Sequence, residues 1–372
     1  MTRRNLLPVV AVLVCLCGAG TAAAQSPPPL PPAPVPVAVP APTPDATTPA
    51  PISTPAPAAP RRGLDEWARP SARRQAAAWP ELASADLSRD ATRGDLDRAI
   101  GILTGTAPAR NPAAPASAWT TNLMFVRALG LDAERRGIAR LRTEDGARIR
   151  LPRYAASEIL ARELGLIYNR LSPQDGRERS RRETVRLADI AYALERARSV
   201  GSWQKARLAR YRDIVLPAMS PQRLAVAQAA LWQVGQPYIW GGDWPGAKSP
   251  WGAQAHGGFD CSGLVWWAFK GKTKASQMSL GIGLLGRTAD QMAWERPGER
   301  VVVADLIPAD LVFFGSGGAT ARKGSIEHTG IALGNGWMVH SSGSRGGVAL
   351  SHLEDYWPSA TAFGRRVAQL GP

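Results

Sequence analysis

Cysteine is scarce in this chain: its 372 residues contain only three. Cys15 lies within an apolar N-terminal segment over 6–16 and Cys17 directly after it; the segment follows Arg3 and Arg4 and precedes three consecutive alanines. This pattern predicts a signal peptide over 1–24 that is removed on export. The mature chain then keeps one thiol, Cys261, which excludes an internal disulfide framework. An unpaired thiol outside the cytosol is prone to oxidation, so it is expected to be a nucleophile, a metal ligand or a buried apolar side chain.

Long apolar runs are also missing. The N-terminal segment is too short for a comfortable membrane span, and no later stretch is long and apolar enough. The residues before Cys15 and Cys17 are Val14 and Leu16, where a lipoprotein signal needs a small residue. We therefore predict an exported protein, secreted or held in the cell envelope, with no stable membrane anchor. The basic start suits ordinary secretion as well as twin-arginine export.

Acidic residues are too few to balance the basic ones, and the formal net charge is +15. The excess lies in residues 61–220, which hold 30 Arg and Lys against 19 Asp and Glu. These basic residues are interleaved with acids and form no long block, so nucleic-acid binding is not expected. An anionic cell-wall polymer or a membrane surface would be a better electrostatic partner. A compositional bias toward arginine, alanine, glycine and proline explains the charge equally well.

The composition and hydrophobic pattern of the sequence change along the chain. Residues 25–62 form a Pro/Ala-rich linker that cannot bury a core and favours extended polyproline II. Residues 63–218 show apolar positions at helical spacing, as in Leu187-Ile190-Ala191-Leu194. From 219 to 372 there are amphipathic helices, Gly/Trp-rich turns and short β-like runs at 301–303, 311–314, 329–333 and 337–340. A mainly helical domain followed by such a region predicts the α+β class.

Several helices expected in the 63–218 region begin with a similar sequence. Caps are expected at residues 92, 121, 152 and 180, which are almost evenly spaced and hint at a diverged repeat. The phrase Phe125-Val126-Arg127-Ala128-Leu129-Gly130-Leu131 weakly resembles the helices of S-layer homology repeats, which bind cell-wall polymers. A wall-targeting or regulatory module is therefore one interpretation. An ordinary helical bundle with similar caps is the other.

Cys261 stands where a Gly/Trp-rich loop becomes an apolar helix. Asp260 is suited to cap that helix. A thiol in the first turn feels the positive end of the helix dipole, which favours the thiolate. Ser262 places a second backbone N–H beside the sulfur, and together with the Cys261 N–H it could hold an oxyanion.

A cysteine nucleophile needs a base, and the chain has only four histidines. His328 begins one β-like run and His340 ends the next, with a Gly-Asn-Gly turn between them. In such a hairpin the two residues are neighbours, so one imidazole can orient the other. His256 and His352 are interpreted as surface residues. The chemical rival is a zinc site made by the cysteine and two histidines.

The segment from Gln236 to Ser342 closely resembles the NlpC-type cell-wall cysteine peptidases. The resemblance implies a circularly permuted, papain-like core with helices packed on a small antiparallel sheet. It also implies Cys261 as nucleophile, His328 as base and His340 as its partner, with no metal or other cofactor. Tyr238 would line the oxyanion site, and Asp260 and Ser262 would position the substrate. The matching phrases are Gly235-Gln236-Pro237-Tyr238-Ile239-Trp240-Gly241-Gly242, Phe259-Asp260-Cys261-Ser262-Gly263-Leu264-Val265, Arg287 with Gln291, Leu311-Val312-Phe313-Phe314, His328-Thr329-Gly330-Ile331 and His340-Ser341-Ser342.

Two positions depart from the family pattern. Ala309 stands where a glycine usually precedes the strand, so the turn there is expected to change. Glu327 stands before the base, where a small residue is common, and is expected to raise the pKa of His328.

The resemblance implies a hydrolase of peptidoglycan stem peptides. It would cut the bond between D-γ-glutamate and a diamino acid through a thioester acyl-enzyme. The alternatives are an amidase or acyltransferase on the same fold, or an inactive wall-binding scaffold.

Overall fold

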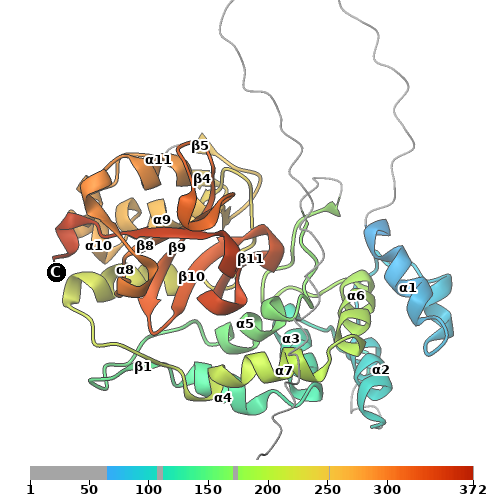
Figure 1. Cartoon of the computed structure of the whole chain (residues 1–372). Helices are drawn as coiled ribbons and strands as arrows, with labels where there is room; N and C mark the ends of the chain where they lie inside the picture. Colours follow the sequence, from blue (N-terminus) through green and yellow to red (C-terminus); the bar gives the residue numbers. More distant parts are fainter. Residues whose placement is uncertain (1–64, 107–111, 171–174, 251, 372) are drawn as a thin grey trace, which may run out of the picture. The chain divides into compact units, whose positions relative to one another are not determined.

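The computed structural model describes residues 65–106, 112–170, 175–250 and 252–371. The predicted signal peptide (1–24) and linker (25–62) lie outside these residues. A mainly helical region precedes a region built on an antiparallel sheet, which agrees with the predicted α+β class (Figure 1). Among the described residues, no helix has the length and apolar character that crossing a membrane requires.

The region before residue 219 is mainly helical because its sequence carries apolar residues at helical spacing. In α6, for example, Leu187, Ile190, Ala191 and Leu194 all face the core. The elements described in this region are α1 (Arg69–Gln75), α2 (Arg93–Thr104), α3 (Ala118–Ala128), α4 (Asp132–Ala139), β1 (Arg142–Thr143), α5 (Ala155–Glu163), α6 (Leu187–Arg198), α7 (Ser202–Leu208) and β2 (Val215–Leu216).

The prediction of evenly spaced helix starts is wrong. Thr92 does cap α2: its hydroxyl accepts the Asp95 N–H at 3.2 Å, and the Asp95 carboxylate accepts the Thr92 N–H at 2.8 Å. The caps of the other helices lie at 117, 154 and 186 instead of 121, 152 and 180. The capping signal at 180 is used in a turn, where the Ser180 N–H donates to the Glu183 carboxylate at 2.8 Å.

The chain nevertheless enters three of the helices, α2, α3 and α6, in the same way. Each follows a short extended segment, and the three segments bond to one another in a ring. Ala91 N–H donates to Val185 O at 2.8 Å, Ala116 N–H to Ala91 O at 3.0 Å, and Val185 N–H to Ala116 O at 2.9 Å. Three related units could pack around such a ring. The repeat and its likeness to S-layer homology units stay predictions.

The region from 219 onward is built on a six-stranded antiparallel sheet. Its strand order is β11 (Gly347–His352), β10 (Trp337–Ser342), β9 (Ile326–Gly334), β8 (Leu311–Gly315), β12 (Thr361–Arg365) and β7 (Arg300–Val301). The remaining elements are α8 (Pro221–Leu231), β3 (Asp243–Trp244), β4 (Lys248–Ser249), β5 (Gly252–Ala253), β6 (Gly258–Phe259), α9 (Cys261–Lys270), α10 (Lys274–Gln277) and α11 (Ala289–Trp294). Helices α8, α9 and α11 all pack against β9. The predicted strands are confirmed as β7 to β10, although β7 ends at residue 301; β11 and β12 were not foreseen.

The hairpin between β9 and β10 turns as its sequence predicts. Asn335 and Gly336 have φ values of 50° and 76°, the left-handed pair that a tight hairpin turn requires. Trp337 pairs with Gly334 across the turn. The start of β9 is thereby brought beside the end of β10.

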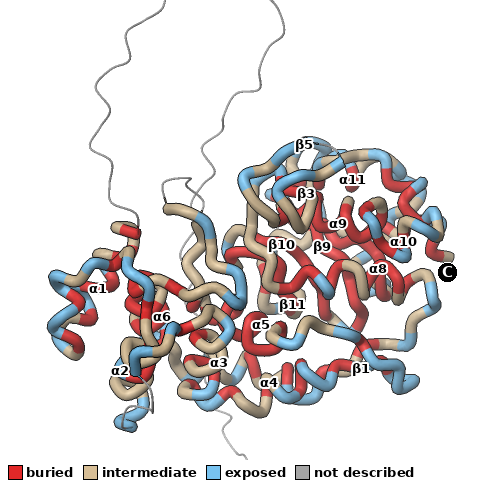
Figure 2. The backbone as a smooth tube through the Cα atoms, turned by 180° about the vertical axis from the view of Figure 1, so that it is seen from behind, coloured by how far each residue is buried: buried red, intermediate tan, exposed pale blue. Residues whose placement is uncertain are grey.

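One apolar core runs through both regions. It joins Ile159 and Leu160 of α5 to Val348 and Leu350 of β11, and α5 contacts β11, the edge strand of the sheet. Figure 2 shows this buried backbone in α5, α9 and the sheet. The residues that follow β10 therefore pack directly against the helical region.

Candidate active site

Cys261 is the first residue of α9 and is 9% exposed. As predicted, Asp260 caps the helix, because its carboxylate accepts the Gly263 N–H. A Cβ at position 263 would lie 1.9 Å from the Gly242 carbonyl oxygen. Position 263 must therefore be glycine for the helix start to pack against the Gly241-Gly242 loop. The sequence segments around Gly242 and Gly263, which both resemble the family, are thus in contact.

Asp260 and Ser262 are hydrogen-bonded to each other and to Arg287. The Ser262 hydroxyl donates to Asp260 at 3.1 Å, and Arg287 donates to the Ser262 hydroxyl at 2.9 Å and to Asp260 at 3.2 Å. Arg287 also donates to the Gly241 carbonyl at 3.1 Å. These contacts hold the loop before α9 in place. The predicted role of Asp260 and Ser262 in positioning substrate stays a prediction.

The electrostatics of the thiol differ from expectation. The backbone N–H groups of Thr329 and Ser262 lower the pKa of Cys261, as a helix start should. Burial outweighs them and, helped by the Asp260 charge, raises the pKa of the thiol from 9.0 to about 12. The helix start therefore favours the thiolate as predicted, but burial outweighs it and the resting thiol is neutral.

His328 and His340 lie side by side, as the hairpin predicts. His328 Nε2 is 2.8 Å from His340 Nδ1, and the two side chains are buried, at 6% and 0% exposed. A Cβ at Gly330 would come within 3.1 Å of the His340 Cβ, so a glycine there leaves room for the second ring. The Thr329 N–H, which lowers the pKa of Cys261, belongs to the residue after His328, so the thiol lies near this end of β9.

Burial also decides the charge of the imidazoles. It lowers the pKa of His328 to about 3 and holds the pKa of His340 well below its ordinary 6.5. Glu327 does not raise the pKa of His328: it lies on the exposed face of β9, because alternate residues of a strand point to opposite faces. The prediction for Glu327 is therefore wrong, and the resting pair is a neutral thiol and a neutral imidazole.

Two aromatic side chains enclose the site. Burial raises the pKa of Tyr238, and a negative charge on the nearby Cys261 raises it further. Tyr356, which sequence reasoning missed, packs edge-on against His340 with ring centroids 4.3 Å apart. The Tyr356 hydroxyl bonds the Ser342 hydroxyl at 2.9 Å. The role of Tyr238 at the oxyanion stays a prediction.

Ser351 and Glu163 were also missed. His340 Nε2 is 3.0 Å from the Ser351 hydroxyl, which donates in turn to the Glu163 carboxylate. Strand alternation could have identified Ser351. Ala349 pairs with His340, and Ser351 lies two positions further along the strand, so its side chain points to the same face. No local signal identifies Glu163, because it comes from α5.

The other two histidines lie elsewhere. His256 and His352 are partly exposed, as expected, and His352 contacts Arg210. Among the described residues, no three His, Cys, Asp or Glu side chains are grouped as metal ligands.

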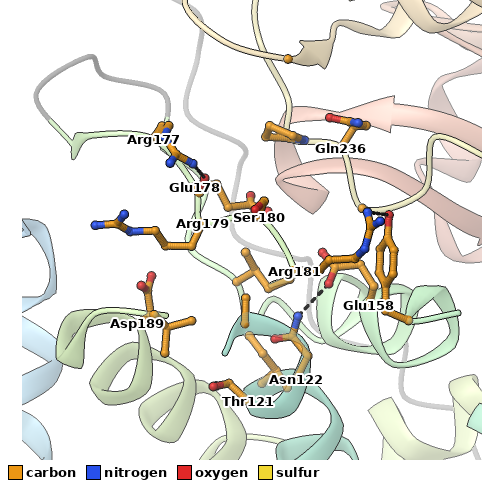
Figure 3. A pocket seen from close by; sticks show the side chains of 18 of the residues that line it. Thr121, Asn122, Glu158, Arg177, Glu178, Arg179, Ser180, Arg181, Asp189 and Gln236 are labelled. Atoms are coloured by element: carbon orange, nitrogen blue, oxygen red, sulfur yellow. Dashed lines mark hydrogen bonds between the residues drawn. The ribbon is translucent and has the colours of Figure 1, made fainter. Parts of the chain in front are cut away.

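A separate pocket of about 270 Å³ lies between the helical region and the loop at Gly235-Gln236-Pro237. Figure 3 shows arginines 177, 179 and 181 around it, together with Glu158, Glu178 and Asp189. Arg177 is ion-paired with Glu183, and Arg181 donates to the Tyr154 hydroxyl at 3.1 Å. The acidic side chains of this pocket are paired with arginines outside its lining, Glu158 and Glu178 with Arg162 and Asp189 with Arg170.

Comparisons with known proteins point to one family. A family model described as "NlpC/P60 family" matches residues 235–366. The chain is 40% identical over 132 residues to the "Probable endopeptidase Rv2190c" of Mycobacterium tuberculosis, and the match covers 34% of this chain and 26% of that protein. It is 34% identical over 136 residues to the "Murein DD-endopeptidase MepH" of Escherichia coli, covering 36% of this chain and 42% of that protein. The chain thus spans less than half of either relative.

Among solved structures, the P60 domain of antigen MAP1204 from M. avium subspecies paratuberculosis is similar, with 31% identity and a TM-score of 0.30. The match covers 39% of this chain and 94% of that chain.

Proposed function

Because residues 235–366 form a domain of the NlpC/P60 family, a cysteine peptidase family with peptidoglycan endopeptidase members, we propose that this protein is an exported endopeptidase that cuts peptidoglycan stem peptides. The observation that carries the proposal is the buried His328–His340 pair beside a thiol at a helix start. It supports nucleophilic catalysis, in which a histidine near the thiol acts as the base.

The chemistry begins from the neutral pair. As Cys261 Sγ attacks the scissile carbonyl carbon, its proton passes to the free nitrogen of His328. The Cys261 N–H stands in the first turn of α9, where no helical carbonyl accepts it, and would bind the oxyanion together with Tyr238. The C–N bond then breaks as the His328 proton goes to the leaving amine. Water, deprotonated by His328, hydrolyses the thioester and restores the thiol.

For the bond that is cut we propose the link between D-γ-glutamate and the diamino acid. Relatives are described as a "Gamma-DL-glutamyl hydrolase" and a "Bifunctional muramidase/DL-endopeptidase", both from Bacillus subtilis. MepH is described as a DD-endopeptidase, so the bond must be measured. An amidase or acyltransferase would use the same thioester, and an inactive scaffold would form none.

Export is proposed from the basic, apolar and alanine-rich start of the chain. An anionic wall polymer as partner of the helical region stays a prediction. Many of the arginines there are ion-paired, including Arg74 with Glu195, Arg89 with Asp95 and Arg98 with Glu81. Their charge is thus partly neutralised within the protein.

The test is mass spectrometry of muropeptides from purified sacculi digested by the wild type and by Cys261→Ala. We expect stem peptides cut after D-γ-glutamate with the wild type and none with the variant, whose thermal unfolding should stay close to that of the wild type. Release of whole stems from the glycan would indicate an amidase. If Cys261→Ala retained full activity, the mechanism would be refuted.

A further inference from the structure

A continuous line of hydrogen bonds leads from the peptidase site into the helical region. His328 Nε2 meets His340 Nδ1 at 2.8 Å, and His340 Nε2 meets the Ser351 hydroxyl at 3.0 Å. Ser351 then donates to the Glu163 carboxylate, which belongs to the last residue of α5. All four side chains are buried. The line therefore joins residues that are 188 positions apart, with Glu163 at the end that lies in the helical region.

The chemistry of these groups fixes the direction of every bond in the line. A carboxylate only accepts, so the single proton of the Ser351 hydroxyl is used toward Glu163. Ser351 must then accept from His340, which places the His340 proton on Nε2. His340 is neutral because burial depresses its pKa, so its Nδ1 is an acceptor for the Nε2–H of His328. His328 is left with an unprotonated Nδ1, which is the form a general base needs.

Glu163 is ion-paired with two arginines. Its Oε2 is 3.2 Å from Arg345 and 3.7 Å from Arg207, and its side chain is 1% exposed. Arg345 lies in the turn after β10 and Arg207 in α7. An arginine side chain can only donate hydrogen bonds, so the atom of residue 163 that faces the two arginines must be an oxygen. The geometry leaves the other oxygen for Ser351.

We propose that Glu163 is a positioning residue which sets the tautomers of His340 and His328, so that the helical region completes the peptidase site. The inference rests on the proposed function. When His328 takes the thiol proton, a buried imidazolium forms, and the line of bonds connects it to the negative charge of Glu163. An aspartate does this for the histidine of serine proteases by direct contact; here two groups intervene.

The test uses Glu163→Gln in the full chain. The glutamine oxygen should face the two arginines, so its NH₂ faces Ser351 and reverses the line of bonds. We expect kcat for stem-peptide cleavage to fall about 10-fold to 100-fold with KM unchanged, less than when a carboxylate touches the catalytic imidazole itself. Nitrogen-15 NMR of labelled histidines should show Nε2–H for both rings in the wild type and a changed tautomer in the variant.

Tyr211→Phe is the matched control. Tyr211 also comes from the helical region, and its buried hydroxyl donates to the Leu350 carbonyl at 2.6 Å, one residue before Ser351. Removing this hydroxyl weakens the same contact between the regions without touching the line of bonds. We expect the Tyr211→Phe variant to keep its kcat and its histidine tautomers.

Ser351→Ala keeps the inference testable if Glu163→Gln does not fold. Ser351→Ala should lower kcat as Glu163→Gln does. The variant that combines both substitutions should be no slower than the slower of the two single variants. Ser351→Thr, which keeps the hydroxyl, should recover most of the rate. Wild-type tautomers with unchanged kcat in Glu163→Gln would overturn the inference, as would an equal loss in Tyr211→Phe. If the wild type cut no stem peptide, the proposed function would fail, and the NMR tautomers would still decide the inference.

Discussion

The resting thiol offers the sharpest check on the electrostatics of the site. Burial raises the pKa of Cys261 from 9.0 to about 12, a difference of three units. At any pH below 9, Cys261 should therefore carry about a thousandfold less thiolate than an ordinary thiol. His328, with its pKa lowered to about 3, supplies no positive charge above pH 4 to reverse this. Many catalytic cysteines are instead held as thiolates by a charged histidine.

The assay is the rate of alkylation by iodoacetamide as a function of pH. Only the thiolate reacts, so the rate should rise about tenfold per pH unit from pH 6 to 10 without a plateau. At pH 7 it should be about a thousandfold below that of a model thiol with a pKa of 9. His328→Ala should alter this profile little, because the imidazole it removes is uncharged.

A plateau of fast alkylation between pH 5 and 8 that disappeared in His328→Ala would refute this reasoning. It would show a thiolate–imidazolium pair at rest, and burial would then be the weaker influence on the thiol. The same outcome would restore the expectation drawn from the helix start alone.

Two further predictions concern stability. Burial raises the pKa of Glu178 from 4.5 to about 7, so the fold favours its protonated form. That stability is full below pH 4.5 and is lost as the pH rises through 7. The free energy of unfolding in urea should therefore fall over this window, and Glu178→Gln should abolish the fall. Ala309 has a φ of 67°, so Ala309→Gly should change the unfolding free energy by less than about 0.5 kcal/mol, because relief of strain offsets the lost methyl group. Ala332→Gly, in the middle of β9, should cost about 1.5 kcal/mol, and an equal loss from both variants would contradict the strain argument.

The local part of the site could be predicted from the sequence. Asp260 before Cys261 defines a helix start, and the Asn-Gly turn fixes which end of β9 meets which end of β10. Both features depend on residues near each other in the chain, so spacing is sufficient. The expected change of the turn at Ala309 is not seen: its φ of 67° is the left-handed conformation that a glycine favours, so the alanine keeps a glycine-type turn.

What depends on tertiary packing could not be predicted. The pKa of Cys261 is set by burial beneath the sheet, and the dipole of one helix gives no measure of that. The helix start expected at 180 failed for a similar reason: residues 184–186 are drawn into the ring of extended segments, and α6 begins only after it. Glu163 lies in another region altogether, and no periodicity relates it to His340.

Arg162 connects the helical region to the sheet that carries the candidate site. Its side chain is fully buried and donates to the Gly346 carbonyl, in the turn before β11, at 2.5 Å. It is also ion-paired with Glu158 at 2.9 Å. A chain shortened to begin at residue 219 would lose these contacts and would leave β11, which carries Ser351, without its covering helix. Such a chain should lose activity even if the helical region binds no wall polymer, so single substitutions in the full chain are needed to separate targeting from catalysis.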